Sequence, residues 1–180
     1  MGVDDGVFTP GSKGFALVVG VVFRGGYWLD GVIHTRVRVD GFDAGGKIAA
    51  MVLGSPHHKQ LRIVMLNGVT FAGFNVVDVR KLNEETGLPV IAVTHERPDF
   101  VKIREALKNL PRSEERWRAV QSGGETFAAQ TRKENGKIYA QASGISPDDA
   151  KKILQMTSTR SSIPEPLRVA HIIASGVSCT

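Results

Sequence analysis

Residues 15–23 read Phe-Ala-Leu-Val-Val-Gly-Val-Val-Phe, a continuous apolar run that is rich in valine. Such a run is typical of a strand that is buried on both faces. Arg24-Gly25-Gly26 follows it and indicates a turn. Residues 28–40 then alternate between polar and apolar side chains, which is the period of a strand with one face toward solvent. Together the two segments predict an antiparallel hairpin.

Helical and apolar segments alternate through the rest of the chain. We expect helices after Asp43 as an N-cap, and over 74–87, 98–110, 113–120, 146–156 and 164–175. We expect strands over 61–66 and 89–93, and a hairpin over 121–142 with its turn at 134–136. This order predicts a mixed sheet with helices on its faces. In such sheets, functional groups gather at the carboxyl ends of strands.

The composition sets limits on the class of protein. The chain has 180 residues, 42% of them hydrophobic and 23% charged, which predicts a single globular domain. The apolar runs are too short for a membrane helix and no signal peptide is seen, so we expect a cytoplasmic protein without a membrane partner. The single cysteine, Cys179, excludes a disulfide framework and a cysteine-based zinc cluster. The net charge of +5 is compatible with a nucleic-acid partner but does not require one.

Two short acidic or amide-bearing turns could carry chemistry. Asp4 and Asp5 precede Gly6, and adjacent carboxylates of this kind can hold Mg²⁺. Asn67 ends a buried strand and is followed by Gly68, but an amide oxygen lacks the charge that a two-metal site uses. Spacing alone favours an ordinary turn at both positions.

Further along the chain, one histidine stands out. His171 shares a helical face with Leu167 and Ala174, which is more typical of a packed boundary residue than of a proton carrier. No glycine-rich nucleotide-binding loop and no Gly-x-Ser-x-Gly motif is present. The residues alone therefore indicate an α/β domain with a possible acidic cluster.

Four segments resemble a known family. They are Gly-Val-Asp-Asp-Gly at 2–6, Val-Phe-Arg-Gly-Gly-Tyr-Trp-Leu-Asp-Gly at 22–31, Met-Leu-Asn-Gly-Val-Thr-Phe-Ala-Gly-Phe-Asn at 65–75, and Ile-Pro-Glu-Pro-Leu-Arg-Val-Ala-His at 163–171. The chain resembles the archaeal endonuclease dU family, which is related to endonuclease V. The resemblance implies one ribonuclease H-like α/β domain over residues 1–180, with a mixed sheet flanked by helices. It also implies a hydrolase that uses Mg²⁺, or Mn²⁺, to nick DNA containing deaminated bases, at deoxyuridine.

The resemblance assigns roles to several positions of this chain. Asp4 matches the first catalytic aspartate, with Asp5 beside it as a further metal ligand. A second aspartate is expected at position 67, where this chain has Asn67. His171 matches an Asp or His presented by the last helix, and Asp43 lies near an acidic residue that opens the first helix.

The departure at position 67 leaves several interpretations open. Asparagine keeps the shape of aspartate but lacks the charge that helps to hold Mg²⁺. The chain is then an inactivated variant, a weak homologue, or an enzyme that relies on its other carboxylates. The alternatives are a non-catalytic protein that binds damaged nucleic acid, and endonuclease V-like cleavage at deoxyinosine or inosine.

Contacts with the nucleic acid are expected from basic, small and aromatic residues. A lesion enzyme must approach the phosphates closely and expose the altered base. The candidates are Arg24, Gly25, Gly26, Tyr27, Gly68, Phe71, Phe74 and Arg168, with Trp28 as a further stacking residue. The alternative interpretation of Arg24, Gly25 and Gly26 is a basic hairpin turn. The alternative for the aromatic residues is ordinary core packing.

Overall fold

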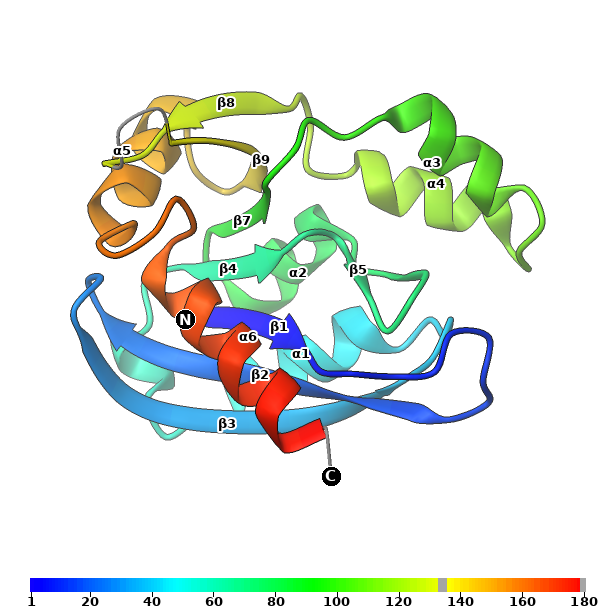
Figure 1. Ribbon diagram of the computed structural model, residues 1–180, viewed down its shortest axis with the longest axis horizontal. Helices are drawn as coiled ribbons and strands as arrows, with labels where there is room; N and C mark the ends of the chain where they lie inside the picture. The colour runs from blue at the N-terminus through cyan, green and yellow to red at the C-terminus, as the bar shows by residue number, and fades with distance from the viewer. Residues whose placement is uncertain (133–135, 179–180) are drawn as a thin grey trace.

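A seven-stranded mixed sheet forms the centre of the computed structural model, which describes residues 1–132 and 136–178 (Figure 1). The strand order is β3-β2-β1-β4-β7-β9-β8. The strands are β1 (Gly2–Asp5), β2 (Phe15–Arg24), β3 (Trp28–Arg38), β4 (Val64–Asn67), β7 (Val90–Thr94), β8 (Phe127–Gln130) and β9 (Lys137–Ser143). Strands β1, β4 and β7 run parallel, and the other neighbours pair antiparallel. Two short strands, β5 (Thr70–Phe71) and β6 (Asn75–Val76), form a separate hairpin.

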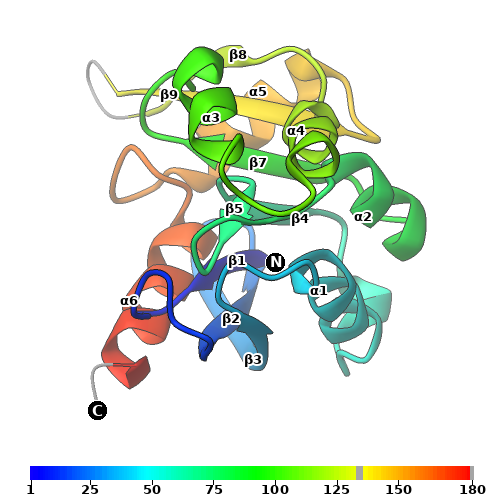
Figure 2. The same cartoon turned by 90° about the vertical axis from the view of Figure 1, so that its right-hand side faces the viewer.

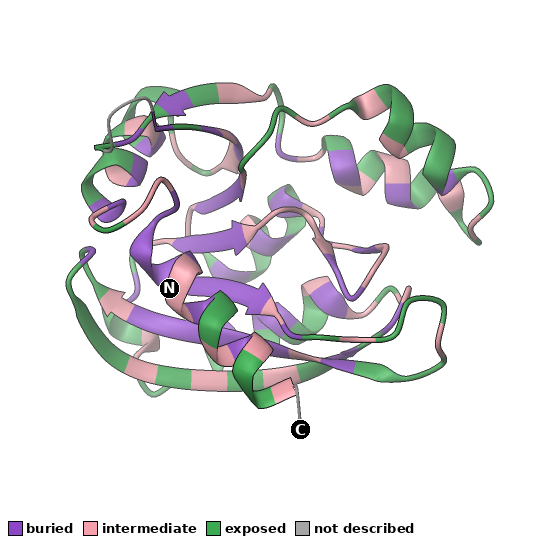
Figure 3. Cartoon of the chain, viewed as in Figure 1, coloured by how far each residue is buried: buried purple, intermediate pink, exposed green. Residues whose placement is uncertain are grey.

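The predicted β2–β3 hairpin is confirmed. Phe15 pairs with Arg38 at one end and Arg24 with Trp28 at the other, with a register shift at Val22 and Phe23. Strand β2 is largely buried, whereas β3 alternates and forms one edge of the sheet (Figure 3). The continuous apolar run therefore lies inside the sheet, and the alternating strand lies at its margin.

Helices cover both faces of the sheet. They are α1 (Ala44–Leu53), α2 (Val79–Thr86), α3 (Phe100–Leu107), α4 (Ser113–Gln121), α5 (Pro147–Thr157) and α6 (Glu165–Ser178), with a short 3₁₀ turn at His58–Gln60. Helix α6 packs on β1 and β2, and α1 lies on the opposite side of the sheet with α2 (Figure 2). In the described part of the chain, no helix has the length and apolarity that crossing a membrane requires.

The helix predicted over 74–87 starts later than expected. Residues Asn75–Val76 form β6 instead, and α2 begins at Val79. Asp78 is extended, and its side chain accepts a hydrogen bond from the Lys81 amide, which makes Asp78 the N-cap. The valines after Asn75 match a helical period, but the polar partners of Asn75 hold this segment as a strand.

Asp43 is the N-cap residue of α1, as predicted, but its side chain makes no capping hydrogen bond. Its Oδ1 accepts hydrogen bonds from the Arg38 amide, at 3.1 Å, and from Asn75 Nδ2, at 2.7 Å. The amide of Ala44 is bound instead by Asn75 Oδ1, at 3.0 Å. The side chain of a buried asparagine that is distant in sequence therefore accepts the hydrogen bond of an amide in the first turn of this helix.

The remaining predicted elements are present with small changes of length. Asp99 accepts hydrogen bonds from the amides of Val101 and Lys102, so α3 begins two residues later than Pro98. Val101 is apolar but 70% exposed, because it lies on the outer side of α3. The hairpin over 121–142 is confirmed as β8 and β9, and residues 134 and 135 of its predicted turn lie outside the described residues.

Candidate active site

The site is built where two parallel central strands end. Strand β1 pairs with β4 so that Val3 lies opposite Leu66, which brings the next residues, Asp4 and Asn67, to the same edge of the sheet. Asn67 Nδ2 donates a hydrogen bond to Asp4 Oδ2 at 2.9 Å. Asp4 is 2% exposed, so its carboxylate is a nearly buried charge that needs such partners.

His171 reaches the same carboxylate from helix α6. Its Nδ1 lies 2.9 Å from Asp4 Oδ2, and its side chain is 62% exposed. Because a carboxylate only accepts hydrogen bonds, Nδ1 carries the proton in this contact. The second ring nitrogen has no hydrogen-bond partner within residues 1–132 and 136–178. Asp4 thus fixes the tautomer of an imidazole whose other side faces outward.

Asp5 lies close to Asp4, and a neighbouring loop also holds its side chain. Its Oδ2 accepts a hydrogen bond from the Ala72 amide at 2.6 Å, and its own amide donates to Asp4 Oδ1 at 2.9 Å. Burial, with a smaller contribution from the nearby charge of Asp4, raises the pKa of Asp5 to about 6. Burial also raises the pKa of Asp4, although its hydrogen bond from Asn67 opposes the rise.

Close packing holds α6 against β1. A Cβ atom on Gly2 would overlap the backbone of Pro166, and one on Gly6 would overlap the side chain of Ser178. Only glycine therefore allows this approach of strand and helix. Gly2 and Gly6 therefore allow α6 to lie close enough to β1 for His171 to reach Asp4.

Asp43, the remaining predicted catalytic residue, belongs to a separate network. It contacts Arg38 and Asn75, and no hydrogen bond joins it to Asp4. The structure therefore brings together Asp4, Asn67 and His171, with Asp5 adjacent, and leaves Asp43 outside this cluster.

The turn from Arg24 to Tyr27 lies at the other end of the central strands (Figure 1). Val21 pairs with Gly2 and Val19 with Asp4, so the residues after Val22 lie beyond the start of β1. Arg24 is paired with Asp30 at 3.2 Å. Tyr27 Oη accepts a hydrogen bond from Arg132 Nη1 at 3.0 Å. These residues, with the glycines between them and the exposed Trp28, form a surface remote from Asp4.

The other predicted contact residues differ in how accessible they are. Phe71 is fully buried and packs in the core. Arg168 is engaged by the buried Glu165 through two hydrogen bonds, of 2.9 and 2.6 Å. Gly68 has a positive φ of 79°, and Phe74 lines a cavity next to it. Gly68, the residue after Asn67, and Phe74 therefore line the same cavity.

Arg116 organises the loops around the site and was missed from the sequence. Arg116 is 2% exposed, and its guanidinium donates to the carbonyl groups of Asp40, at 2.6 Å, and Gly41, at 3.0 Å. It also donates to the carbonyl oxygens of Pro111 and Phe74, and stacks on Phe42 at 3.9 Å from the ring centroid. A buried arginine bound mainly to carbonyl groups gives no periodic signal in the sequence.

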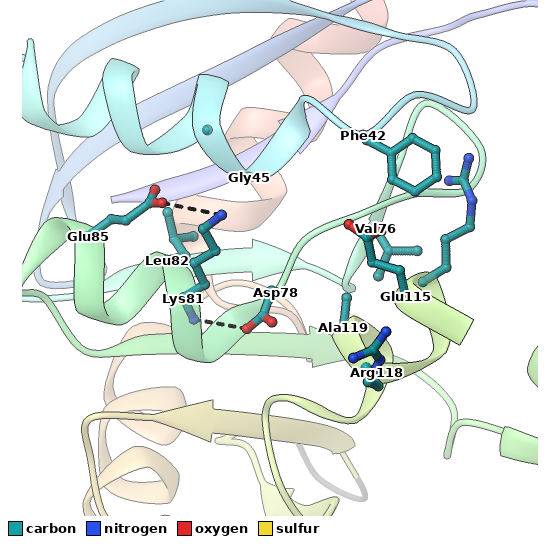
Figure 4. A pocket seen from close by; sticks show the side chains of 12 residues that line it. Phe42, Gly45, Val76, Asp78, Lys81, Leu82, Glu85, Glu115, Arg118 and Ala119 are labelled. Atoms are coloured by element: carbon teal, nitrogen blue, oxygen red, sulfur yellow. Dashed lines mark hydrogen bonds and ion pairs between the residues drawn. The ribbon is translucent and has the colours of Figure 1, made fainter. Parts of the chain in front are cut away.

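A cavity of about 470 Å³ lies between α1, α2 and α4 (Figure 4). Its charged side chains already have structural partners. Lys81 pairs with Glu85 at 3.8 Å, Glu115 pairs with Arg112, and Asp78 caps α2. None of the residues clustered around Asp4 lines this cavity.

Carboxylate and amide groups supply the donor atoms at the end of β1. Over residues 1–132 and 136–178, no three His, Cys, Asp or Glu side chains gather as a metal-binding group. The cluster instead combines the Asp4 carboxylate with the Asn67 amide, and Asp5 lies beside it. These are the oxygen donors that a hard cation prefers, with one charge fewer than an aspartate at position 67 would give. The donor set therefore fits Mg²⁺ in chemistry, with reduced charge.

Comparison with known proteins identifies relatives over nearly the whole chain. A UPF0215 protein of Methanothermobacter thermautotrophicus is 53% identical over 178 residues, which cover 98% of this chain and 86% of that protein. A UPF0215 protein of Methanopyrus kandleri is 51% identical over 177 residues, covering 98% of this chain and 89% of that protein.

Solved structures share the fold. A protein of unknown function from Archaeoglobus fulgidus has a TM-score of 0.87 and 34% identity, covering 98% of this chain and 95% of that one. Endonuclease V of Ciona intestinalis, solved with DNA that contains an inosine followed by a ribo-adenosine, has a TM-score of 0.57 and 16% identity, covering 99% and 84%. The sequence model of the family described as endonuclease dU matches residues 1–178. The chain therefore belongs to the endonuclease dU family and has the ribonuclease H-like fold of endonuclease V.

Proposed function

We propose that this protein is a metal-dependent endonuclease that nicks DNA at deoxyuridine. The observation that carries the proposal is the contact of Asn67 and His171 with one buried carboxylate, Asp4, where β1 and β4 end. Family membership and the fold shared with endonuclease V support a nuclease-like function. A neighbour of this fold solved with inosine-containing DNA supports a nucleic-acid substrate with a deaminated base.

Asp4 and Asn67 are the residues that would hold Mg²⁺, with Asp5 as a further carboxylate. Asn67 presents its amide nitrogen to Asp4, and rotation of the amide group would present its oxygen to a cation instead. Bound Mg²⁺ would activate a water molecule and stabilise the charge that develops on the phosphate. Mn²⁺ has the same preference for oxygen ligands and is expected to substitute.

His171 would handle a proton during cleavage. Asp4 holds the proton of Nδ1, which leaves Nε2 of the exposed ring free to take a proton or, when the ring is protonated, to donate one to a leaving oxygen. The buried carboxylate also stabilises the positive charge of a protonated ring, as in other acid–histidine pairs. His171 is thus proposed as the general acid or base, and Asp4 as the residue that orients it.

A second candidate function is favoured by the residue at position 67. Asparagine there removes a charge that a nuclease would use, which is compatible with a protein that binds damaged nucleic acid without cleaving it. The third candidate is endonuclease V-like cleavage at deoxyinosine.

Nicking assays separate these candidates. The protein is incubated with duplexes that carry one deoxyuridine, one deoxyinosine or an unmodified base, in Mg²⁺ or in EDTA. We expect nicking at deoxyuridine that requires Mg²⁺, that is lost in Asp4→Asn, and that is faster by about 10² in Asn67→Asp. The exposed Asn109→Asp adds the same charge elsewhere and should leave the rate unchanged. If neither the protein nor Asn67→Asp nicks while another family member does under the same conditions, the enzymatic proposal is wrong. Lesion-selective binding in EDTA would then support the binding protein.

A further inference from the structure

The turn between β2 and β3 carries large apolar side chains at the surface. Tyr27, Trp28 and Leu29 are all exposed, Trp28 to 69%. Exposed apolar residues that gather in one place mark interaction surfaces, and interfaces are enriched in Trp, Tyr, Met and Arg. Along β2, roughly 16 Å separates Val19, which pairs with Asp4, from Arg24, which pairs with Trp28. This surface is therefore distinct from the candidate active site.

Contacts with distant residues hold this turn in place. Thr159 Oγ1 donates a hydrogen bond to the carbonyl of Gly26 at 2.8 Å, and Arg132 Nη1 donates to Tyr27 Oη at 3.0 Å. A Cβ atom on Gly26 would overlap the side chain of Thr159, so the turn packs closely on the segment that follows α5. Trp28 therefore extends from a backbone that is already ordered, which lowers the entropy lost when it binds a partner.

An open cavity of about 350 Å³ lies beside the same turn. Arg24, Gly25 and Asp30 of the hairpin line one side of it, and the exposed Met156 of α5 lines another. Buried apolar residues complete the lining, among them Met1, Val22, Leu61 and Met65. Trp28 does not line this cavity, so the chain does not fill it with its own indole.

We propose that two copies of this protein associate about a two-fold axis, with Trp28 of each copy inserted into this cavity of the other. Trp28 pairs with Arg24 across the hairpin, and Arg24 lines the cavity, so the indole and the cavity are neighbours on one surface. A two-fold interface joins the same surface of both copies and therefore requires such self-complementarity. The inference does not depend on the proposed function.

The charges and the volume of the cavity fit a second copy. Arg24 and Asp30 form an exposed ion pair at 3.2 Å, and in a two-fold assembly each can also pair with the opposite charge of the partner. Arg62, the other cation of the lining, is exposed and can stack on the inserted indole. The volume lies near the lower end of the roughly 300–1,000 Å³ of pockets that hold drug-sized ligands, which leaves room for an indole ring.

The association should be weak, because a single anchoring side chain on each copy carries it. Small interfaces are typical of transient complexes, so we expect a Kd of about 1–100 μM. A tryptophan buried at the centre of an interface commonly carries much of the binding energy. Because the contact occurs twice about the axis, Trp28→Ala should weaken dimerisation by about 10²-fold or more, and Trp28→Phe should weaken it less.

Sedimentation velocity over about 1–300 μM protein measures the association. Met156→Glu places a charge in the cavity and should weaken dimerisation as Trp28→Ala does, whereas Val101→Ala removes an exposed apolar side chain elsewhere and should leave the Kd unchanged. All three residues are exposed, so these variants should keep the fold, which circular dichroism checks. In a Trp117→Phe background Trp28 is the only tryptophan, and its emission should move to shorter wavelength as the protein concentration rises.

Mixing two variants tests the reciprocal geometry. Trp28→Ala keeps the cavity and Met156→Glu keeps the indole, so a mixed pair retains one of the two contacts. The mixture should therefore associate more strongly than either variant alone. The parent should form nothing larger than a dimer, because a closed two-fold interface leaves no free binding surface.

Several results would overturn the proposal. A parent protein that stays monomeric at the highest concentration would do so, as would a Trp28→Ala variant that associates as the parent does. A mixture that associates no better than its components, or assemblies that grow beyond the dimer, would exclude the reciprocal two-fold contact. A monomer in which Trp28→Ala weakens only DNA binding would assign this surface to nucleic acid. None of these results depends on nicking, which tests the proposed function separately.

Discussion

Replacing Asn67 with aspartate should destabilise the metal-free protein and make its stability depend strongly on Mg²⁺. In the structure, Asn67 donates a hydrogen bond to the buried carboxylate of Asp4 at 2.9 Å. Aspartate at that position has no proton to donate at neutral pH, so two carboxylates would face each other across the same short distance.

Two terms set the size of the loss. A hydrogen bond to a charged group contributes roughly 1.5–3 kcal/mol. Repulsion between unit charges about 4 Å apart is about 4 kcal/mol at an effective dielectric constant of 20, and uptake of a proton by the pair relieves part of it. We therefore expect Asn67→Asp to lower the free energy of unfolding by about 2–5 kcal/mol at mildly alkaline pH in EDTA.

Urea unfolding followed by circular dichroism measures this difference. Each protein is unfolded in EDTA and in excess MgCl₂ at about pH 5 and about pH 8. The loss of unfolding free energy in Asn67→Asp should be larger at the higher pH, because the proton shared by the carboxylates at positions 4 and 67 is then released. Mg²⁺ should restore most of this lost stability. It should also stabilise the variant more than the parent, since the cation replaces repulsion between the carboxylates with attraction.

Asn109→Asp is the matched control, because it makes the same change at an exposed position. It should alter the free energy of unfolding by less than about 0.5 kcal/mol in both buffers. Equal stability of Asn67→Asp and the parent in EDTA, or an equal gain of the two from Mg²⁺, would refute the inferred contact between position 67, Asp4 and the metal.

Three further substitutions test the surrounding residues. Burial raises the pKa of Asp5 from 3.8 to about 6, so its favourable neutral form is lost as the pH rises through this range. Asp5→Asn should therefore exceed the parent by about 1–3 kcal/mol in urea unfolding at alkaline pH and match it below about pH 4. His171→Gln retains a donor to Asp4 but no titratable proton, so nicking should fall about 10²–10⁴-fold while the Mg²⁺-induced rise in melting temperature persists. Arg116→Met removes the donors to four carbonyl groups and should cost about 3 kcal/mol of unfolding free energy, against almost none for the exposed Arg118→Met. A melting temperature of Arg116→Met equal to that of the parent would show that this cluster is not structurally important.

The sheet and part of the site could be predicted from local patterns. The buried β2 and the alternating β3 follow from residue periodicity, and that pattern extends over enough residues to define both strands. Asp4 and Asn67 could be expected to converge because functional groups gather where parallel strands end. The resemblance to the family added His171, which spacing alone favours as a packing residue.

Contacts between distant residues explain what could not be predicted. Asn75 holds the start of α1 and the end of β3, and neither partner is near it in sequence. Asp43 stands at the N-cap position as expected, but its carboxylate binds Asn75 and not the first turn of the helix. Arg116 lies in a helix rich in charged residues, where a solvent-exposed face is the ordinary expectation.

The most direct test of the proposed metal centre is anomalous diffraction from crystals of the protein grown or soaked with Mn²⁺. We predict one anomalous peak within coordination distance of Asp4, with the oxygen of Asn67 turned toward it and His171 close by, and the same peak with higher occupancy in Asn67→Asp. A peak elsewhere, or no peak at Asp4 in either protein at saturating Mn²⁺, would contradict the assignment of Asp4 and position 67 as the metal-binding centre of a nuclease.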